Sequence, residues 1–71
     1  MARTNAQQKL GKKVKQFRLD AVLTQEKLGE LTGLDRTYIS GIERGIRNPA
    51  IKNIGKLAKA LKVKISELTD F

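Results

Sequence analysis

The sequence predicts an all-α fold: a compact bundle of five short helices in one domain, residues 1–71. Apolar residues recur at intervals of three and four along most of the chain, which is the spacing of one helix face. Gly33, Gly45 and Pro49 divide these stretches into short segments. The sequence holds no strand pattern of useful length and no internal repeat. A chain of 71 residues has room for one modest core. We expect residues 1–5 to form a flexible, basic N-terminus.

The first predicted helix carries its apolar residues on one face: Leu10, Val14, Phe17 and Ala21. Thr4 or Asn5 would cap its start, because a short polar side chain accepts a hydrogen bond from the first free N–H groups. Gly11 costs about 1 kcal/mol relative to alanine inside a helix, so we expect the beginning of this helix to fray.

The second predicted helix begins after Thr24, whose hydroxyl suits an N-cap, with Glu26 favourably placed in the first turn. Leu28 and Leu31 form its inner face, and Gly33 ends it.

Asp35 then caps a third helix, with Ile39 and Ile42 facing inward and Gly45 ending it.

A fourth amphipathic helix is predicted from Ala50 onward, after the turn at Asn48 and Pro49. Its apolar face is Ile51, Ile54, Leu57, Ala58 and Leu61, and its outer face is Lys52, Lys56, Lys59 and Lys62. Ser66 caps a last short helical turn that contains Leu68.

The second and third predicted helices are separated only by Gly33 and Leu34, too short a turn for an antiparallel pair. A brief glycine turn instead joins two helices at a steep angle. Gly29 removes a side chain at the point where the third helix crosses the second. This spacing is typical of a helix-turn-helix unit, in which the start of the second helix projects into the DNA major groove.

Polar side chains crowd the start of the third helix, where such a unit reads DNA. Arg36 and Thr37 fall where side chains reach base edges, and arginine binds guanine O6 and N7 with two hydrogen bonds. The Ser40 hydroxyl, one helical turn later, can donate or accept a hydrogen bond. The Tyr38 ring would pack against sugar or a thymine methyl group while its hydroxyl meets a phosphate. The alternative for each residue alone is an ordinary solvated helix position.

The charge distribution points to a polyanionic partner. Lys and Arg number 15 against seven acids, for a net charge of +8. Residues 1–19 and 44–64 hold 13 of the basic residues and no acid. Nucleic acid is the first candidate at this density, and a solvated basic surface is the alternative.

Several function classes are disfavoured. The chain has no cysteine and no histidine, so we expect no disulfide, no thiolate metal site, no metal, no cofactor and no enzymatic activity. No apolar run approaches a membrane span, and the N-terminus has no signal-peptide segment, which favours a soluble cytoplasmic protein. RNA binding stays open but lacks aromatic stacking platforms. A membrane-active amphipathic peptide is disfavoured because the helices are short and suit mutual burial.

The stretch "TQEKLGELTGLDRTYISGIERGIRNPAIKNIGKLAKALKVKISEL" resembles the Cro/phage-repressor type of helix-turn-helix domain, the XRE family. The resemblance runs from about Leu10 to Leu68 and implies a lambda-repressor-like fold. "LDRTYISGIERGIRN" is similar to the small controller proteins of restriction–modification systems, which are dimeric DNA-binding regulators of transcription.

The resemblance also implies roles for individual residues. Base reading falls on Arg36, Thr37 and Ser40. Backbone contacts fall on Gln25, Tyr38, Arg44, Arg47 and Asn48, together with the amides that open the fourth helix. Arg18 and Glu43 correspond to an ion pair that ties the first helix to the end of the third.

Three positions depart from the family pattern. Val22 stands where glycine is common, so the first helix would end differently. Ala50 replaces a common serine cap, which weakens the fourth helix by about 1 kcal/mol unless Asn48 substitutes. Gly41 lies where a long polar side chain is common, which leaves fewer base contacts.

We expect a homodimer on a near-palindromic operator, because two linked units roughly double the DNA contacts. The candidate interface is the apolar C-terminal set Leu61, Val63, Ile65, Leu68 and Phe71, whose alternative role is to close the monomer core. RNA polymerase is a candidate second partner of such a transcription regulator. An antitoxin or another protein-interaction module with the same fold is the alternative function.

Overall fold

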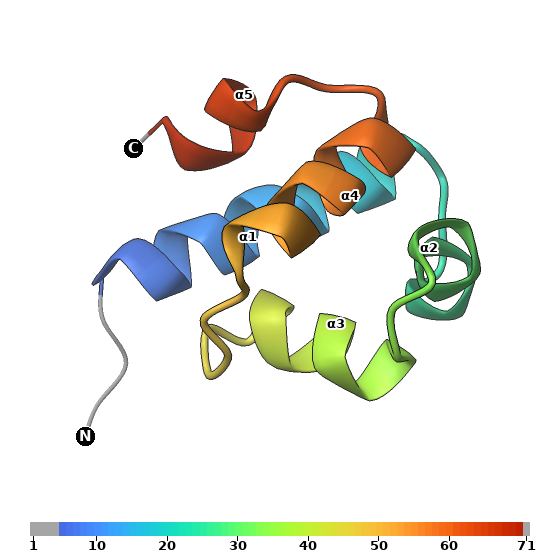
Figure 1. Ribbon diagram of the computed structural model, residues 1–71, viewed down its shortest axis with the longest axis horizontal. Coiled ribbons are helices and arrows are strands. Elements are labelled where there is room, and N and C mark those ends of the chain that lie inside the picture. The colour runs from blue at the N-terminus through green and yellow to red at the C-terminus, as the bar shows by residue number, and fades with distance from the viewer. Residues whose placement is uncertain (1–4, 71) are drawn as a thin grey trace.

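A computed structural model describes residues 5–70, which form five helices and no strand (Figure 1). The helices are α1 (Asn5–Asp20), α2 (Gln25–Thr32), α3 (Arg36–Glu43), α4 (Ile51–Leu61) and α5 (Ile65–Thr69). The predicted all-α fold is therefore confirmed. The expected flexible N-terminus lies outside the described residues except for Asn5, which is already the first residue of α1.

The helices pack around a central pair, α1 and α4, with α3 on one side of it and α5 on the other (Figure 1). Helix α1 contacts α3, α4 and α5, whereas α2 contacts α3 and α4. The buried apolar core draws on all five helices: Leu10, Val14, Leu28, Ile39, Ile42, Ile54, Leu57, Ala58, Leu61 and Leu68. Burial of each large aliphatic side chain stabilises the fold by about 1.5–3 kcal/mol.

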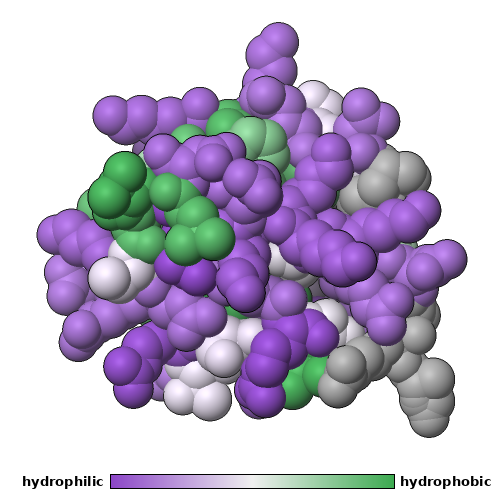
Figure 2. All heavy atoms as spheres, turned by 180° about the vertical axis from the view of Figure 1, so that it is seen from behind, coloured by the Kyte–Doolittle hydropathy of each residue, from purple (hydrophilic) through white to green (hydrophobic). Residues whose placement is uncertain are grey.

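Three apolar residues expected to face inward do not. Leu31 is 52% exposed and Ile51 is 71% exposed. Leu31 lies in the last turn of α2, beside an opening toward α4, and Ile51 is the first residue of α4, ahead of the part that reaches the core. Ala21 is also exposed, because α1 ends at Asp20. The face opposite to that of Figure 1 is largely hydrophilic, with hydrophobic side chains gathered in a few places (Figure 2).

Most helix ends follow the predicted caps. The Thr24 hydroxyl accepts a hydrogen bond from the Lys27 N–H at 2.9 Å. Gly33, at a φ of 76°, ends α2 in the left-handed conformation that glycine adopts without strain. At the start of α4, Ala50 gives no side-chain cap, and Asn48 does not replace it.

The expected cap of the last helix is wrong. Helix α5 begins at Ile65 with Lys64 as its N-cap residue, so Ser66 lies inside the first turn. The Glu67 carboxylate accepts a hydrogen bond from the Lys64 N–H at 2.7 Å and satisfies the backbone at this end.

Gly11 allows a close helix crossing. It is buried, and a Cβ atom there would overlap the carbonyl oxygens of Ile42 and Glu43 at the end of α3. Because any other residue would force the two backbones apart, Gly11 brings α1 against the end of α3. The expectation that this glycine merely weakens the start of α1 missed that role.

Val22, one of the departures from the family pattern, ends the first helical segment in a strained conformation. Its φ is 58°, in the left-handed region that β-branched residues rarely adopt, and its side chain is 90% exposed. The Val22 N–H donates to the Leu19 carbonyl at 2.9 Å, and the Leu23 N–H donates to the Arg18 carbonyl at 3.0 Å. The turn is therefore fixed by its hydrogen bonds, although the side chain at its centre opposes it.

We predict that Val22→Gly stabilises the protein by up to about 1 kcal/mol, since it removes left-handed strain while the greater freedom of the unfolded glycine offsets part of the gain. Urea unfolding measures the change. Leu19→Gly is the control, because Leu19 is exposed within helical backbone and glycine there costs about 1 kcal/mol. A similar loss in both variants would contradict the assigned strain.

Candidate nucleic-acid interface

The turn between α2 and α3 is as tight as its two-residue spacing predicts. A Cβ atom at Gly29 would lie 2.8 Å from the Leu34 carbonyl oxygen, so only glycine lets the turn pack against α2. Asp35 then caps α3, accepting a hydrogen bond from the Thr37 N–H at 2.6 Å. The chain thus leaves α2 and enters α3 within three residues, and α3 begins beside α2 with Arg36 and Thr37 exposed (Figure 1).

The two sides of α3 have different roles. Ile39 and Ile42 are fully buried and hold the helix on the core. Arg36 and Thr37 are exposed at its first turn, and Ser40 is half-buried one turn later. The three residues expected to read bases therefore lie along the outward part of one short helix.

Hydrogen bonds with the backbone N–H and the side chain of Thr37 lower the pKa of the Asp35 carboxyl group. Because the folded-state pKa lies below the unfolded one, the stabilising effect of this cap is present above the ordinary carboxyl range. It is lost as the pH falls through the lowered pKa. The start of α3 is therefore fully capped at neutral pH.

Tyr38 is less free than expected. Its ring is half-buried and packs on the core, and its hydroxyl accepts a hydrogen bond from Asn53 Nδ2 at 3.2 Å. The Arg47 guanidinium lies over the ring, with Cζ 5.9 Å from the centroid. Tyr38 thus links α3 to α4 and to the following loop. No pattern in the sequence marks Asn53 as the partner of Tyr38.

Gly41 explains how Arg47 reaches this position. A Cβ atom at residue 41 would lie 2.5 Å from Arg47 Cγ, so the arginine chain occupies the space that a side chain on α3 would fill. The N–H groups of Ile46 and Arg47 both donate to the Gly41 carbonyl, at 3.0 and 3.2 Å. The missing side chain at Gly41 is therefore partly replaced by a neighbouring cation held beside α3.

A buried ion pair fixes the other end of α3. Arg18 Nε donates to Glu43 Oε2 at 2.6 Å, and Arg18 Nη2 donates to Oε1 at 3.0 Å. The two side chains are 9% and 3% exposed. Hydrogen bonding to Glu43 raises the pKa of Arg18 and outweighs the opposing effect of burial. The structure thus joins the two residues that the family resemblance paired.

The same cluster holds the start of α2. Arg18 Nη1 donates to the Leu23 carbonyl at 2.8 Å, and Gln25 Nε2 donates to Glu43 Oε1 at 3.1 Å. Gln25 is the residue expected to contact a DNA phosphate. One carboxylate therefore orients both the cation of α1 and the amide of α2.

The remaining backbone-contact residues lie near the loop after α3. Arg44, Arg47 and Asn48 are all exposed, and Arg44 Nε donates to the Ser40 carbonyl at 3.4 Å. The loop leads into α4, whose first N–H groups carry no side-chain cap. Cations and free N–H groups together suit a phosphate.

The expected dimer interface is wrong for two of its residues. Leu61 is 6% exposed and Leu68 is fully buried, and both belong to the monomer core. They pack there because α5 folds back onto α1 and α4. Val63 is half-buried against the same core, and Ile65 is 43% exposed. Phe71 lies outside the described residues.

Residues 5–70 contain no group of three or more side chains that could hold a metal ion. No helix in the same range is long and apolar enough to cross a membrane.

A family model described as helix-turn-helix (HTH_3) matches residues 14–68. The chain belongs to this helix-turn-helix family. The matched range includes all of α2, the turn and α3, and most of α5.

Similar members of the helix-turn-helix family include controller proteins. The control protein C.BamHI of Bacillus amyloliquefaciens is 52% identical over 62 residues, which cover 86% of this chain and 76% of that protein. The structure of the restriction–modification controller protein C.AhdI of Aeromonas hydrophila matches with a TM-score of 0.85 at 45% identity, over 87% of this chain and 94% of that one. The structure of C.Esp1396I bound to a 19 base pair DNA duplex matches with a TM-score of 0.85 at 39% identity, over 94% of this chain and 89% of that one.

We predict that Glu43→Ala destabilises the fold by about 3–5 kcal/mol, because it leaves the buried Arg18 cation unpaired. Urea unfolding measures the change, and Glu43→Gln, which keeps an acceptor oxygen, should lose less. Glu30→Ala is the control: its pair with Lys27 is exposed, at 3.5 Å, and is worth at most about 1 kcal/mol. Equal effects at residues 30 and 43 would contradict the role assigned to burial.

Proposed function

We propose that this protein is a sequence-specific regulator of transcription that binds double-stranded DNA as a homodimer on a near-palindromic operator. The observation that carries the proposal is the exposed start of α3, with Arg36 and Thr37 at the surface of a helix fixed to the core by Ile39 and Ile42. Such a helix fits the DNA major groove.

Base reading is assigned to Arg36, Thr37 and Ser40. The Arg36 guanidinium suits the O6 and N7 atoms of guanine, and the two hydroxyl groups each donate or accept. Because the Asp35 cap holds the first turn of α3, the backbone that carries Arg36 and Thr37 is ordered before DNA binds, which lowers the entropy cost of binding.

DNA-backbone contacts are assigned to Gln25, Tyr38, Arg44, Arg47 and Asn48. Gln25 is oriented by Glu43, and Arg47 is held against the Tyr38 ring, so both side chains lose less conformational freedom on binding than unrestrained ones. Contacts of this kind position the protein without reading sequence. The net charge of +8 supplies the matching field and makes the affinity fall with added salt.

The relatives support the more specific role of a controller in a restriction–modification system. C.BamHI and C.AhdI are named as control and controller proteins, and C.Esp1396I is named in a complex with duplex DNA. The proposed function is binding rather than catalysis, in the cytoplasm, with RNA polymerase as a further partner at the regulated promoter.

The homodimer is proposed on the exposed Ile65 and the half-buried Val63, together with Phe71 beyond the described range. Two copies would place their half-sites about 34 Å apart, one turn of DNA. Sedimentation that shows a monomer both alone and on DNA would contradict the homodimer.

We predict that Arg36→Ala and Arg44→Ala weaken DNA binding in different ways. Arg36→Ala removes a base contact, which costs about 1–3 kcal/mol on the preferred sequence and relaxes the preference at one base pair. Arg44→Ala weakens binding to all sequences alike and lowers the salt slope by about one unit.

Fluorescence anisotropy over a salt series, on a selected duplex and on a scrambled one, measures both effects. Lys15→Ala, an exposed cation of α1, is the control for loss of charge alone. Equal weakening of both duplexes by Arg36→Ala would contradict its role in reading.

A further inference from the structure

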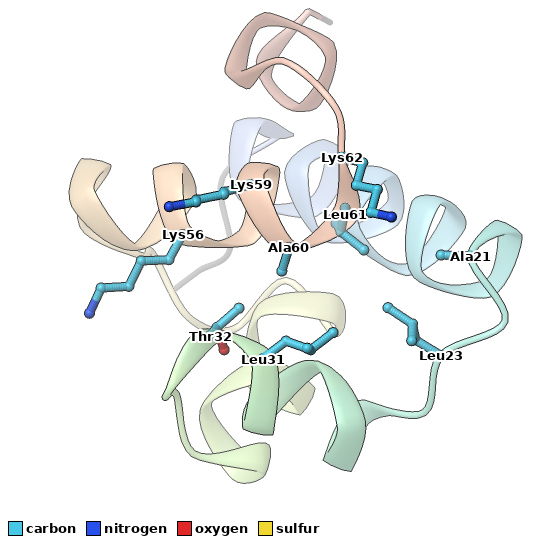
Figure 3. A pocket seen from close by; sticks show the side chains of 9 residues that line it. All are labelled: Ala21, Leu23, Leu31, Thr32, Lys56, Lys59, Ala60, Leu61 and Lys62. Carbon is cyan, nitrogen blue, oxygen red and sulfur yellow. The ribbon is translucent and has the colours of Figure 1, made fainter.

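A groove of about 850 Å³ opens between α2 and α4 (Figure 3). Leu31 and Thr32 of α2 face Ala60 and Leu61 of α4 across it, and the turn after α1 closes one end with Ala21 and Leu23 (Figure 3). The floor is therefore largely apolar. Leu31, expected in the core, instead exposes 52% of its surface at this groove.

The rim of the groove is cationic. Lys56, Lys59 and Lys62 line it, and no acidic residue does. The two ion pairs found among residues 5–70 join other side chains, Arg18 to Glu43 and Lys27 to Glu30. The three ammonium groups thus have no carboxylate partner, and an anionic ligand would meet unpaired positive charge along the groove.

The groove lies apart from the proposed DNA-reading surface. No residue of α3 lines it. The hollow beside Arg36 is formed by a different part of α2, including Glu26 and Glu30. A ligand in the groove therefore leaves Arg36 and Thr37 uncovered.

We propose that this groove binds an acidic, amphipathic segment of a protein partner. Apolar side chains of the segment would pack on Leu31 and Ala60, and its carboxylates would pair with the lysine rim. A DNA backbone would satisfy the lysines but offers only the carbon atoms of its sugars, between charged phosphates, to cover Leu31. A second copy of this chain, with seven acidic residues against 15 basic ones, matches the cationic rim less well than an acidic segment does. The groove thus gives the protein a docking surface that is free while it holds DNA.

The test uses a fluorescent peptide of about 14 residues, roughly four helical turns, built from leucine, alanine, aspartate and glutamate. Its leucines are spaced three and four apart, on one face. A scrambled peptide of the same composition, without that face, reports charge attraction alone. Anisotropy titration of the full chain should show binding of the amphipathic peptide at least about tenfold tighter, the equivalent of about 1.4 kcal/mol.

Matched variants locate the binding. Leu31→Ser should abolish the difference in affinity between the two peptides, whereas Leu19→Ser should retain that difference. The two leucines are equally exposed, at 52% and 53%, but Leu19 does not line the groove. Lys59→Gln should weaken the binding of the amphipathic peptide more than Lys15→Gln does. Thermal unfolding of each variant verifies that the fold is kept.

Three results would overturn the proposal. Equal affinity for both peptides would mean that charge attraction alone causes the binding and that the apolar floor of the groove has no part in it. A larger loss of DNA affinity from Lys59→Gln than from Lys15→Gln would make DNA the occupant. Self-association that Leu31→Ser abolishes would make a second copy the occupant. None of these results depends on whether Arg36 reads bases, so they test the groove independently of the proposed DNA-binding function.

Discussion

The bidentate pair between Arg18 and Glu43 is the interaction on which the presentation of α3 depends. Arg18 donates two hydrogen bonds to Glu43. Arg18 also donates to the Leu23 carbonyl, and Glu43 also accepts from the Gln25 amide. One buried cluster therefore joins α1, the turn after it, the start of α2 and the end of α3. A charge pair so shielded from water is tolerated because its hydrogen bonds are satisfied, and the buried polar side chains of residues 5–70 include none without a partner.

Three glycines determine how closely the neighbouring parts of the chain pack around α3 and the turn before it. Gly11 brings α1 against the end of α3, and Gly29 lets the turn fold onto α2. Gly41 admits the Arg47 chain beside α3. Each replaces a side chain with backbone or with a neighbouring residue. Helix α3 is thus held at its buried face and its C-terminal end, while the side chains of its first turn, which Asp35 caps, are exposed to solvent.

Helices α1, α3 and α4 are predictable because their buried apolar residues repeat at three and four, and α2 because Thr24 and Gly33 mark its ends. Periodicity identifies an apolar face but not the neighbour that covers it. For that reason the pattern does not distinguish the exposed Leu31 and Ile51 from core residues, nor a dimer contact from a core position at Leu61 and Leu68. The location of Arg36 and Thr37 followed from spacing. The Tyr38–Asn53 bond and the Gly11 contact join residues distant in sequence, which no local pattern encodes.

Chemical-shift mapping of the isotope-labelled protein, with a duplex selected from a random pool, tests the central claim most directly. We expect the largest changes in backbone amide chemical shift in the first turns of α2 and α3 and in the loop that leads into α4, with little change along the lysine face of α4. Changes concentrated on that lysine face, with the start of α3 unaffected, would show that the protein grips DNA by charge alone and would contradict the account.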